Sequence, residues 1–307
     1  MNGLLVIDKP PGLSSHGAVV RMRRALGERR IGHTGTLDPA ATGVLPLVLG
    51  RATRLARFLT VATKSYAAVI RLGSRTTTGD TEGERIGPGH SGPLPSVETI
   101  DAALDAFRGT FLQQPPAFSA KRIGGQRSYR LARSALSVQP RPAEVTAHAI
   151  HIDQVSGARV ALRVECSAGF YVRSLADDLG ERLGTGAYLE SLRRTKSGEF
   201  TLADAIGLDV AENQPLDAAR RVIPPARLLT RLTSVTLTGE GLRRATHGRD
   251  LGPADWVSSG SEIGEPPELS RSGQPSVIRL LDERGDLIGI AEAVSASGLL
   301  HPAVVLV

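Results

Sequence analysis

The sequence predicts an α+β fold, in which a central, mainly antiparallel mixed sheet is followed by a small β-rich unit. The expected strands and helices follow one another in mixed order, without the regular strand–helix–strand alternation of a doubly wound fold. A double proline within residues 222–232 interrupts this order, and a hairpin pattern follows it. The 307 residues are enough for one large and one small domain. We therefore expect domains at 1–229 and 230–307.

The N-terminal elements follow from apolar runs and from the residues at their ends. The run at 3–10 predicts a strand that stops at consecutive prolines. A helix comes next, because Ser14 or Ser15 can cap its first turn and Gly27 suits its C-terminal exit. A further strand is expected at 64–73.

The central part of the chain alternates between loop, helix and strand signals. Residues 79–95 are rich in Gly and Pro and predict a loop, after which Ser96 caps a short helix. Two strands are expected near 145–152 and 159–166, and a helix covers about 171–183.

The C-terminal segment carries one hairpin signal and one biased stretch. Residues 276–294 contain two apolar runs separated by the turn sequence DERGD. Residues 258–276 are rich in Ser, Gly, Pro and Glu, and we expect a flexible loop there.

The composition is that of a globular protein, with 41% apolar and 22% charged residues. The longest apolar runs are too short to span a bilayer, and the first ten residues do not resemble a signal peptide. A single cysteine, Cys166, excludes an intramolecular disulfide and a cysteine-based metal site. We therefore expect a cytoplasmic protein.

The net charge of +6 is concentrated in three basic clusters. Eight arginines stand against two acids in residues 21–57, five basic residues lie in 121–133, and the sequence RRTK occupies 193–196. Clustered basic residues bind phosphates, so a nucleic acid is the leading partner. The alternative is that each cluster is a solvated helix face.

The segment GHTGTLDPAATG, at residues 32–43, places a histidine and an aspartate among glycines and threonines. An Asp before Pro is usually a turn residue that accepts backbone hydrogen bonds, and this reading fits Asp38. His33 alone fits a structural role as well. No catalytic triad, paired-histidine metal motif or phosphate-binding loop accompanies them. Taken alone, the segment leaves both a turn and a catalytic loop open.

Five stretches, in this order and together, resemble the TruB family of tRNA pseudouridine synthases: VIDKPPGLSSH, GHTGTLDPAATGVLPLVLGRATRL, KSYAAVIRLG, GFYVRSLADDLG and LRRTKSG. The resemblance extends over nearly the whole chain. It implies a pseudouridine synthase fold, tRNA as partner, a basic insertion around 115–142 and a small PUA-like RNA-binding domain at the C-terminus. Two positions depart from the family pattern, since Phe170 stands where Thr is usual and Thr77 where Asp is usual.

The resemblance also implies roles for individual residues. Asp38 matches the catalytic aspartate, and Arg173 matches an arginine that pairs with it. His33 matches a residue that contacts the flipped nucleotide, and Tyr66 matches the tyrosine that stacks on the target uracil. Tyr171 matches a second tyrosine that contacts the substrate.

Three further positions match the family pattern. Leu192 matches an apolar residue that lines the uracil pocket. Lys9 and Asp80 fall on recurrent positions whose roles the resemblance leaves open.

The implied chemistry needs few groups. Forming pseudouridine breaks the N-glycosidic bond, turns the uracil and rejoins it through C5, and one ionised carboxylate serves as nucleophile or as base. Nothing is oxidised or lost, so we expect no cofactor and no metal. We expect Arg173 to lower the pKa of Asp38. Tyr66 would offset part of the cost of unstacking the base, about a few kcal/mol.

The leading hypothesis is an isomerase that forms pseudouridine at position 55 in the T-loop of tRNA, acting as a monomer without an obligatory protein partner. The alternatives are a non-catalytic tRNA-binding or tRNA-folding protein on the same scaffold, a glycosidase-type hydrolase with paired carboxylates, and a pseudouridine synthase that acts on another RNA with guide partners.

Overall fold

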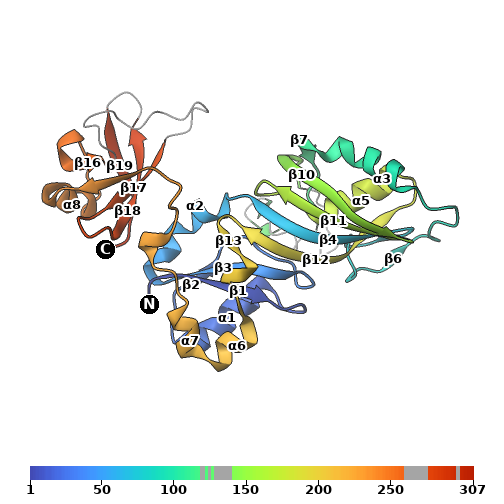
Figure 1. The fold of residues 1–307 in the computed structure, drawn as a ribbon, viewed down its shortest axis with the longest axis horizontal. Helices are drawn as coiled ribbons and strands as arrows, with labels where there is room; N and C mark the ends of the chain where they lie inside the picture. Colours follow the sequence, from blue (N-terminus) through green and yellow to red (C-terminus); the bar gives the residue numbers. More distant parts are fainter. Residues whose placement is uncertain (118–121, 124–125, 128–139, 259–275, 295–297) are drawn as a thin grey trace.

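The computed structural model describes residues 1–117, 122–123, 126–127, 140–258, 276–294 and 298–307. Two sheets dominate these residues, a large one built from the first two thirds of the chain and a smaller one near the C-terminus (Figure 1). Most of the basic insertion expected at 115–142, and nearly all of the loop expected at 258–276, lie outside the described residues.

The α-helices of the described residues are α1 (Ser15–Leu26), α2 (Ala56–Thr60), α3 (Val97–Leu104), α5 (Val172–Arg182), α6 (Leu208–Asn213), α7 (Pro215–Arg220) and α8 (Gly239–Thr246). A 3₁₀ turn, η1 (Gly50–Leu55), leads into α2. In the described part of the chain, no helix has the length and apolar character needed to cross a membrane.

The strands of the large sheet are β1 (Gly3–Lys9), β2 (Ile31–His33), β3 (Thr42–Leu49), β4 (Lys64–Leu72), β7 (Gly109–Gln113), β10 (Ala143–Ser156), β11 (Arg159–Cys166), β12 (Ala187–Ser197), β13 (Phe200–Thr201) and β14 (Ile206–Gly207). Two short pairs lie outside it, β5 (Arg75–Thr76) with β6 (Arg85–Ile86) and β8 (Arg122–Ile123) with β9 (Gln126–Arg127). The smaller sheet contains β15 (Ser234–Leu237), β16 (Trp256–Ser258), β17 (Val277–Leu281), β18 (Leu287–Val294) and β19 (Leu299–Val305).

The large sheet has the strand order β14-β1-β3-β12-β4-β11-β10-β7, with β2 beside β3 and β13 beside β12. The β1–β14 and β3–β12 pairs are parallel, and the other pairs in this sheet are antiparallel. The predicted α+β class with a mainly antiparallel mixed sheet is therefore confirmed.

The ends of α1 form as the sequence predicts. The Ser14 hydroxyl accepts a hydrogen bond from the Gly17 amide at 3.0 Å, and Gly27 ends the helix with φ 63°. Ser96 caps α3 in the same way, through the Thr99 amide. These caps satisfy amides and carbonyls that a helix end otherwise leaves without partners.

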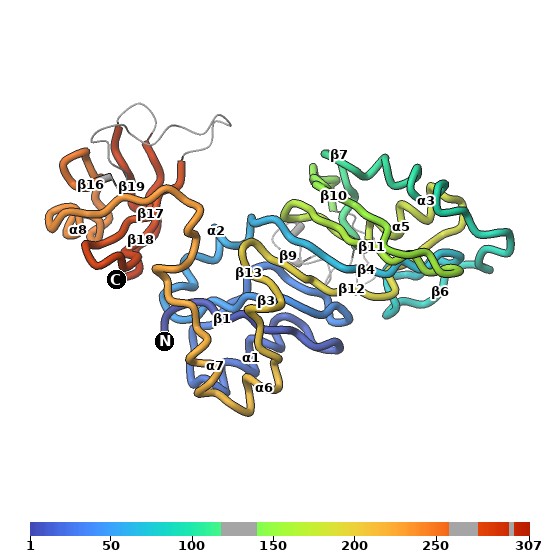
Figure 2. The backbone as a smooth tube through the Cα atoms, viewed as in Figure 1, coloured from blue at the N-terminus to red at the C-terminus, as the bar shows by residue number. Residues whose placement is uncertain are grey.

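The smaller sheet packs against the large one through a shared apolar cluster. Leu287, Ile290 and Leu306 from the C-terminal part lie in one cluster with Leu4 and Val44 of the large sheet. The backbone trace shows the segment between α7 and β15 leading from one sheet to the other (Figure 2).

Three arginines of the basic cluster at 21–57 bridge the two sheets. Arg51 and Arg54 donate to the carbonyls of Leu306 and Val305, at 3.1 and 2.6 Å. Arg57 forms an ion pair with Glu292 at 3.1 Å. Part of this cluster is therefore used in holding the C-terminal sheet.

The two halves of the large sheet meet where β3 runs parallel to β12. Only two register pairs join these strands, Thr42 with Arg193 and Gly43 with Arg194. Gly43 has φ 100°, and a Cβ there would lie 2.2 Å from the Arg194 carbonyl oxygen. A glycine is therefore required at this contact, both for its backbone conformation and for the close approach of β12.

We predict that Gly43→Ala destabilises the protein more than Gly157→Ala does. Gly157 also has a positive φ, 55°, but no atom lies within 4 Å of its would-be Cβ. Its substitution should therefore cost about 1–2 kcal/mol, from the left-handed conformation alone. Gly43→Ala adds a backbone clash that separates β3 from β12. Urea unfolding of both variants measures the difference, and equal losses would contradict the assigned role of Gly43.

Candidate active site

The loop between β2 and β3 carries Asp38 and is fixed from both sides. The Leu37 side chain is buried in the core, and its amide donates to the Ser15 hydroxyl at 2.7 Å while that hydroxyl donates back to the Leu37 carbonyl at 3.0 Å. The Gly12 amide donates to the Pro39 carbonyl at 2.9 Å. These bonds hold the residues on either side of Asp38.

Lys9 also holds the Asp38 loop in place. Its ammonium donates to three backbone carbonyls, those of Pro10, Leu13 and Pro39, at 2.8, 2.6 and 3.1 Å. Burial lowers the pKa of Lys9 to about 8, while the charge of Asp38 opposes this shift. Lys9 thus joins the first turn of the chain to the Asp38 loop.

Arg173 connects two carboxylates. It lies in the first turn of α5, and its side chain is 5% exposed. The Arg173 Nε lies 2.9 Å from Oδ2 of Asp38 and 3.6 Å from Oδ2 of Asp80, and Nη1 donates to the Thr78 carbonyl at 3.1 Å. The expected pairing of Arg173 with Asp38 is present, and Asp80 joins the same guanidinium.

The two carboxylates differ in their access to solvent. Asp80 is buried, and its Oδ1 accepts from the Thr78 hydroxyl at 2.5 Å and from the Glu82 amide at 3.0 Å. Asp38 keeps 39% of its side chain exposed and lines a cavity. Asp38 is therefore the carboxylate that a bound molecule can reach.

The pKa of Asp38 lies above its ordinary value, contrary to the expectation that Arg173 would lower it. Burial is the main cause, Arg173 opposes it, and the nearby charge of Asp80 raises the pKa further. Arg173 acts in the expected direction, but desolvation of the carboxylate outweighs it.

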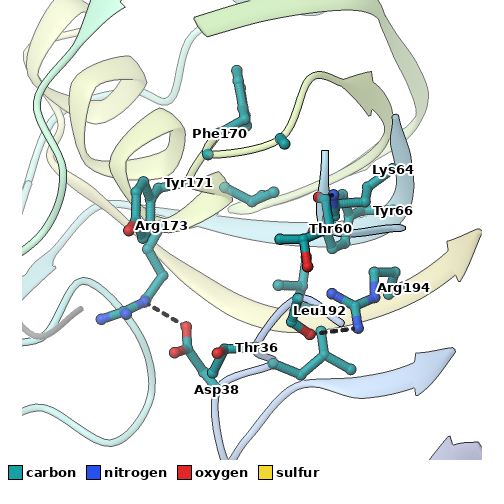
Figure 3. Close-up of a pocket in the computed structure, with 15 residues that line it drawn as sticks. Thr36, Asp38, Thr60, Lys64, Tyr66, Phe170, Tyr171, Arg173, Leu192 and Arg194 are labelled. Carbon is teal, nitrogen blue, oxygen red and sulfur yellow. Dashed lines mark hydrogen bonds and ion pairs between the residues drawn. The ribbon is translucent and has the colours of Figure 1, made fainter. Parts of the chain in front are cut away.

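A cavity of about 330 Å³ brings most of the predicted site residues together. It is lined by Gly35, Thr36, Leu37, Asp38, Thr60, Lys64, Tyr66, Ala168, Gly169, Phe170, Tyr171, Val172, Arg173, Leu192 and Arg194. In Figure 3, Asp38 and Arg173 lie on one side, Lys64, Tyr66 and Arg194 on the other. The volume suits one nucleobase with its sugar, at the small end of ligand pockets.

Strands β4 and β12 supply the side opposite Asp38. Tyr66 and Arg194 are register partners on these strands, and Leu192 lies two residues before Arg194. Tyr66 is 8% exposed, and burial raises its pKa even though the Arg194 guanidinium opposes the shift. An aromatic face and an aliphatic side chain therefore border the cavity beside a cation.

Arg194 corrects the interpretation of the sequence RRTK as a phosphate-binding cluster. Its side chain is fully buried, and it donates to the carbonyls of Val44 at 2.7 Å and Gly35 at 3.0 Å. Arg193 forms an ion pair with Asp8 at 2.6 Å. The cluster faces inward at Arg194 because β12 lies in the middle of the sheet.

Tyr171 lies at the N-terminal end of α5, where its backbone is held by a buried glutamine. The Gln113 side chain donates to the Tyr171 carbonyl at 3.0 Å and accepts from its amide at 2.8 Å. Phe170 packs edge-on against Phe111, with ring centroids 6.1 Å apart. The aromatic at position 170 therefore continues an apolar cluster up to the cavity wall.

The structure does not bring every predicted residue into the cavity. Asp38, Tyr66, Tyr171, Arg173 and Leu192 line it, whereas His33 lies at the end of β2 and is not among the lining residues.

Three residues important to the site were missed in the sequence: Lys64, Gln113 and Arg194. The spacing of Lys64 and Tyr66, two apart on one strand, was a signal that both share a face.

Two family models match the chain. Residues 23–172 match the N-terminal domain of the TruB family pseudouridylate synthases, and residues 173–227 match the tRNA pseudouridylate synthase B C-terminal domain.

Solved structures share the fold. A Cbf5–Nop10–Gar1 complex contains a chain with a TM-score of 0.73 and 25% identity, covering 99% of this chain and 85% of that one. An H/ACA RNP bound to a substrate RNA containing 2′-deoxyuridine gives 0.72 and 24%, with 99% and 85% covered. These neighbours bear out the fold that the sequence resemblance implies.

Curated relatives match over nearly the full length. The tRNA pseudouridine synthase B of Solibacter usitatus (strain Ellin6076) is 40% identical over 313 residues, 100% of both chains. That of Synechococcus sp. (strain CC9311) is 42% identical, covering 99% of this chain and 97% of the relative. That of Thermobifida fusca (strain YX) is 39% identical, covering 90% and 98%. The chain belongs to the TruB family of pseudouridylate synthases.

Proposed function

We propose that this chain isomerises uridine to pseudouridine at position 55 in the T-loop of tRNA, with Asp38 as the catalytic carboxylate. The observation that carries the proposal is the geometry around Asp38. It is the solvent-accessible partner of a buried arginine, and it lines a cavity of nucleoside size together with Tyr66 and Leu192. The relatives named tRNA pseudouridine synthase B support tRNA as the substrate.

The reaction moves one bond and one proton. The C1′–N1 bond breaks, a C1′–C5 bond forms, and the proton on C5 is replaced by one on N1, so the product has the composition of the substrate. Asp38 acts at the sugar, as nucleophile or as base. Arg173 holds the carboxylate in place and favours its ionised form against the effect of burial.

Tyr66 and Leu192 would hold the uracil. An extruded base loses its stacking partners, and an aromatic face restores part of that interaction. Tyr171 borders the cavity from α5 and would contact the nucleotide. We infer that His33, which is not among the cavity-lining residues, contacts the flipped nucleotide from outside the cavity.

The C-terminal sheet is proposed as a PUA-like RNA-binding domain beginning near residue 230, after a catalytic domain at 1–229. Helix α8 carries the exposed Arg243 and the half-buried Arg244, and the exposed Arg249 follows it. Basic side chains on one helix would add salt-dependent, sequence-independent affinity for phosphates. We infer that the protein works as a monomer in the cytoplasm.

The alternatives explain the site less well. A glycosidase would need a second accessible carboxylate, but Asp80 is buried and already accepts from Thr78 and Glu82. A non-catalytic binding protein would have no need for a buried arginine beside Asp38, because burying a charged group costs free energy. A synthase guided by partners is less well supported, because the full-length relatives at about 40% identity are tRNA enzymes by name.

We predict that Asp38→Asn abolishes tritium release from C5-labelled uridine in a tRNA transcript while leaving tRNA binding nearly unchanged. The amide fills the same space but cannot act as nucleophile or base. Asp217→Asn, at an exposed carboxylate paired with Arg220, is the matched control and should behave as the native protein. Normal turnover by Asp38→Asn would show that another group is catalytic. Binding without release by the native protein would favour the binding-protein alternative.

We also predict opposite pH effects for the two neighbours of Asp38. The reaction needs ionised Asp38, so its rate falls as the pH drops through the pKa of this carboxyl. Arg173→Met removes the charge that lowers this pKa and should move the acid limb to higher pH. Asp80→Asn removes a charge that raises it and should move the limb to lower pH. Single-turnover rates across the acid range measure the shift for each variant. If the acid limbs of both variants moved in the same direction by the same amount, the limb could not be assigned to Asp38.

A further inference from the structure

The charges that line the cavity are separated between its two sides. Asp38 and Arg173 form an ion pair on one side, at 2.9 Å. The opposite side carries two more cations, Lys64 and Arg194 (Figure 3). Within the described ranges, no carboxylate lies within 4.0 Å of either of these two side chains. The cavity therefore has an excess of positive charge away from Asp38.

Lys64 is buried at the start of β4, with 6% of its surface exposed. Its ammonium donates to the carbonyls of Thr60 at 2.8 Å and Ala62 at 2.6 Å. An ammonium has three protons, so two of them hold the turn that follows α2. Among the residues that the structure describes, none accepts the third proton, which is left for another acceptor.

The side chains of Lys64 and Arg194 come close together beside Gly35. A Cβ at Gly35 would lie 3.4 Å from both Cε of Lys64 and Nη1 of Arg194. The bonds of Arg194 to Val44 and Gly35 are to neutral carbonyls, and they leave its positive charge uncompensated. Burying two like charges this close costs free energy, and burial together with Arg194 lowers the pKa of Lys64 to about 8. Such an arrangement is explained when an anion or a developing negative charge is bound beside it.

The proposed reaction generates such a charge on this side of the cavity. When the C1′–N1 bond breaks, its electron pair stays with the uracil, and the negative charge spreads over N1, O2 and O4. With Asp38 at the sugar and Tyr66 on the ring, the uracil is directed toward the side that holds Lys64 and Arg194. The negative charge on the uracil is neutralised once C5 bonds to C1′ and the C5 proton is exchanged for one on N1.

We propose that Lys64 and Arg194 form a positively charged wall of the cavity, and that this wall stabilises the negative charge of the departing uracil. This inference rests on the proposed function. It assigns the electrostatic part of glycosidic bond cleavage to two side chains on β4 and β12, and bond breaking at the sugar to Asp38. Preorganised cations in a dry site stabilise such charge more than water does, because they do not reorganise during the reaction.

The test compares Lys64→Met with Lys64→Arg in single-turnover reactions on a tRNA transcript. Lys64→Met removes the charge with little change in length and should slow isomerisation by about 10²-fold. Its affinity for tRNA should stay close to that of the native protein. Lys64→Arg keeps the charge and should recover most of the rate. Arg194→Lys, which keeps its charge, should also lose less than Arg194→Met.

A transcript with 5-fluorouridine at the target position separates charge stabilisation from a structural role. Fluorine withdraws electrons, so the uracil anion is more stable and needs the cations less. The rate loss of Lys64→Met, measured as consumption of the target nucleoside after digestion, should therefore be smaller on this transcript than on the uridine transcript. Thermal melting of each variant identifies those that do not fold.

Equal losses on both transcripts, or a loss in affinity with an unchanged rate, would overturn this inference. Lys64→Arg as slow as Lys64→Met would do the same. None of these outcomes touches the proposed function, which fails if the native protein binds tRNA and releases no tritium from C5, or if Asp38→Asn turns over normally.

Discussion

The large sheet is continuous only because β3 and β12 approach each other at Gly43. On one side of this contact lie β14, β1, β2 and β3, and on the other lie β12, β13, β4, β11, β10 and β7. The cavity lies across the same contact. Asp38 comes from the loop before β3, whereas Tyr66, Leu192 and Arg194 come from β4 and β12. Each half supplies only part of the site, so the missing side chain at Gly43 sets the distance between the two parts.

Buried polar bonds then fix each part separately. Lys9 and Ser15 hold the Asp38 loop to the N-terminal half, and Arg194 reaches across the contact to the Gly35 carbonyl. Arg173 reaches Asp38 from α5. The carboxylate is thus held between the two halves by groups that are themselves hydrogen-bonded to the backbone. Preorganisation of this kind places the reacting groups before the substrate binds.

Much of this could be predicted from the sequence. Helix caps, alternating strands and the hairpin at 276–294 depend on neighbouring residues, and these local signals held at Ser14, Gly27 and Ser96. The pairing of Arg173 with Asp38 could be inferred only through the family resemblance, since the two are 135 positions apart along the chain.

Burial was the property that local patterns could not supply. Basic residues are usually exposed, so the sequence RRTK indicated a surface cluster, whereas β12 turns Arg194 into the core. The same reason explains the sign of the Asp38 pKa. The motif predicted that an arginine lies beside Asp38. The desolvation that outweighs the effect of this arginine on the pKa depends on the whole fold.

The arginines of residues 21–57 also change how the net charge of the chain should be interpreted. Arg21 pairs with Glu212, Arg23 donates to Ile31, and Arg51, Arg54 and Arg57 bridge to the C-terminal sheet. A phosphate that binds one of these side chains competes with a bond already made inside the protein. Counting basic residues therefore overstates the number of counterions released when RNA binds, and with it the steepness with which affinity falls as salt is added.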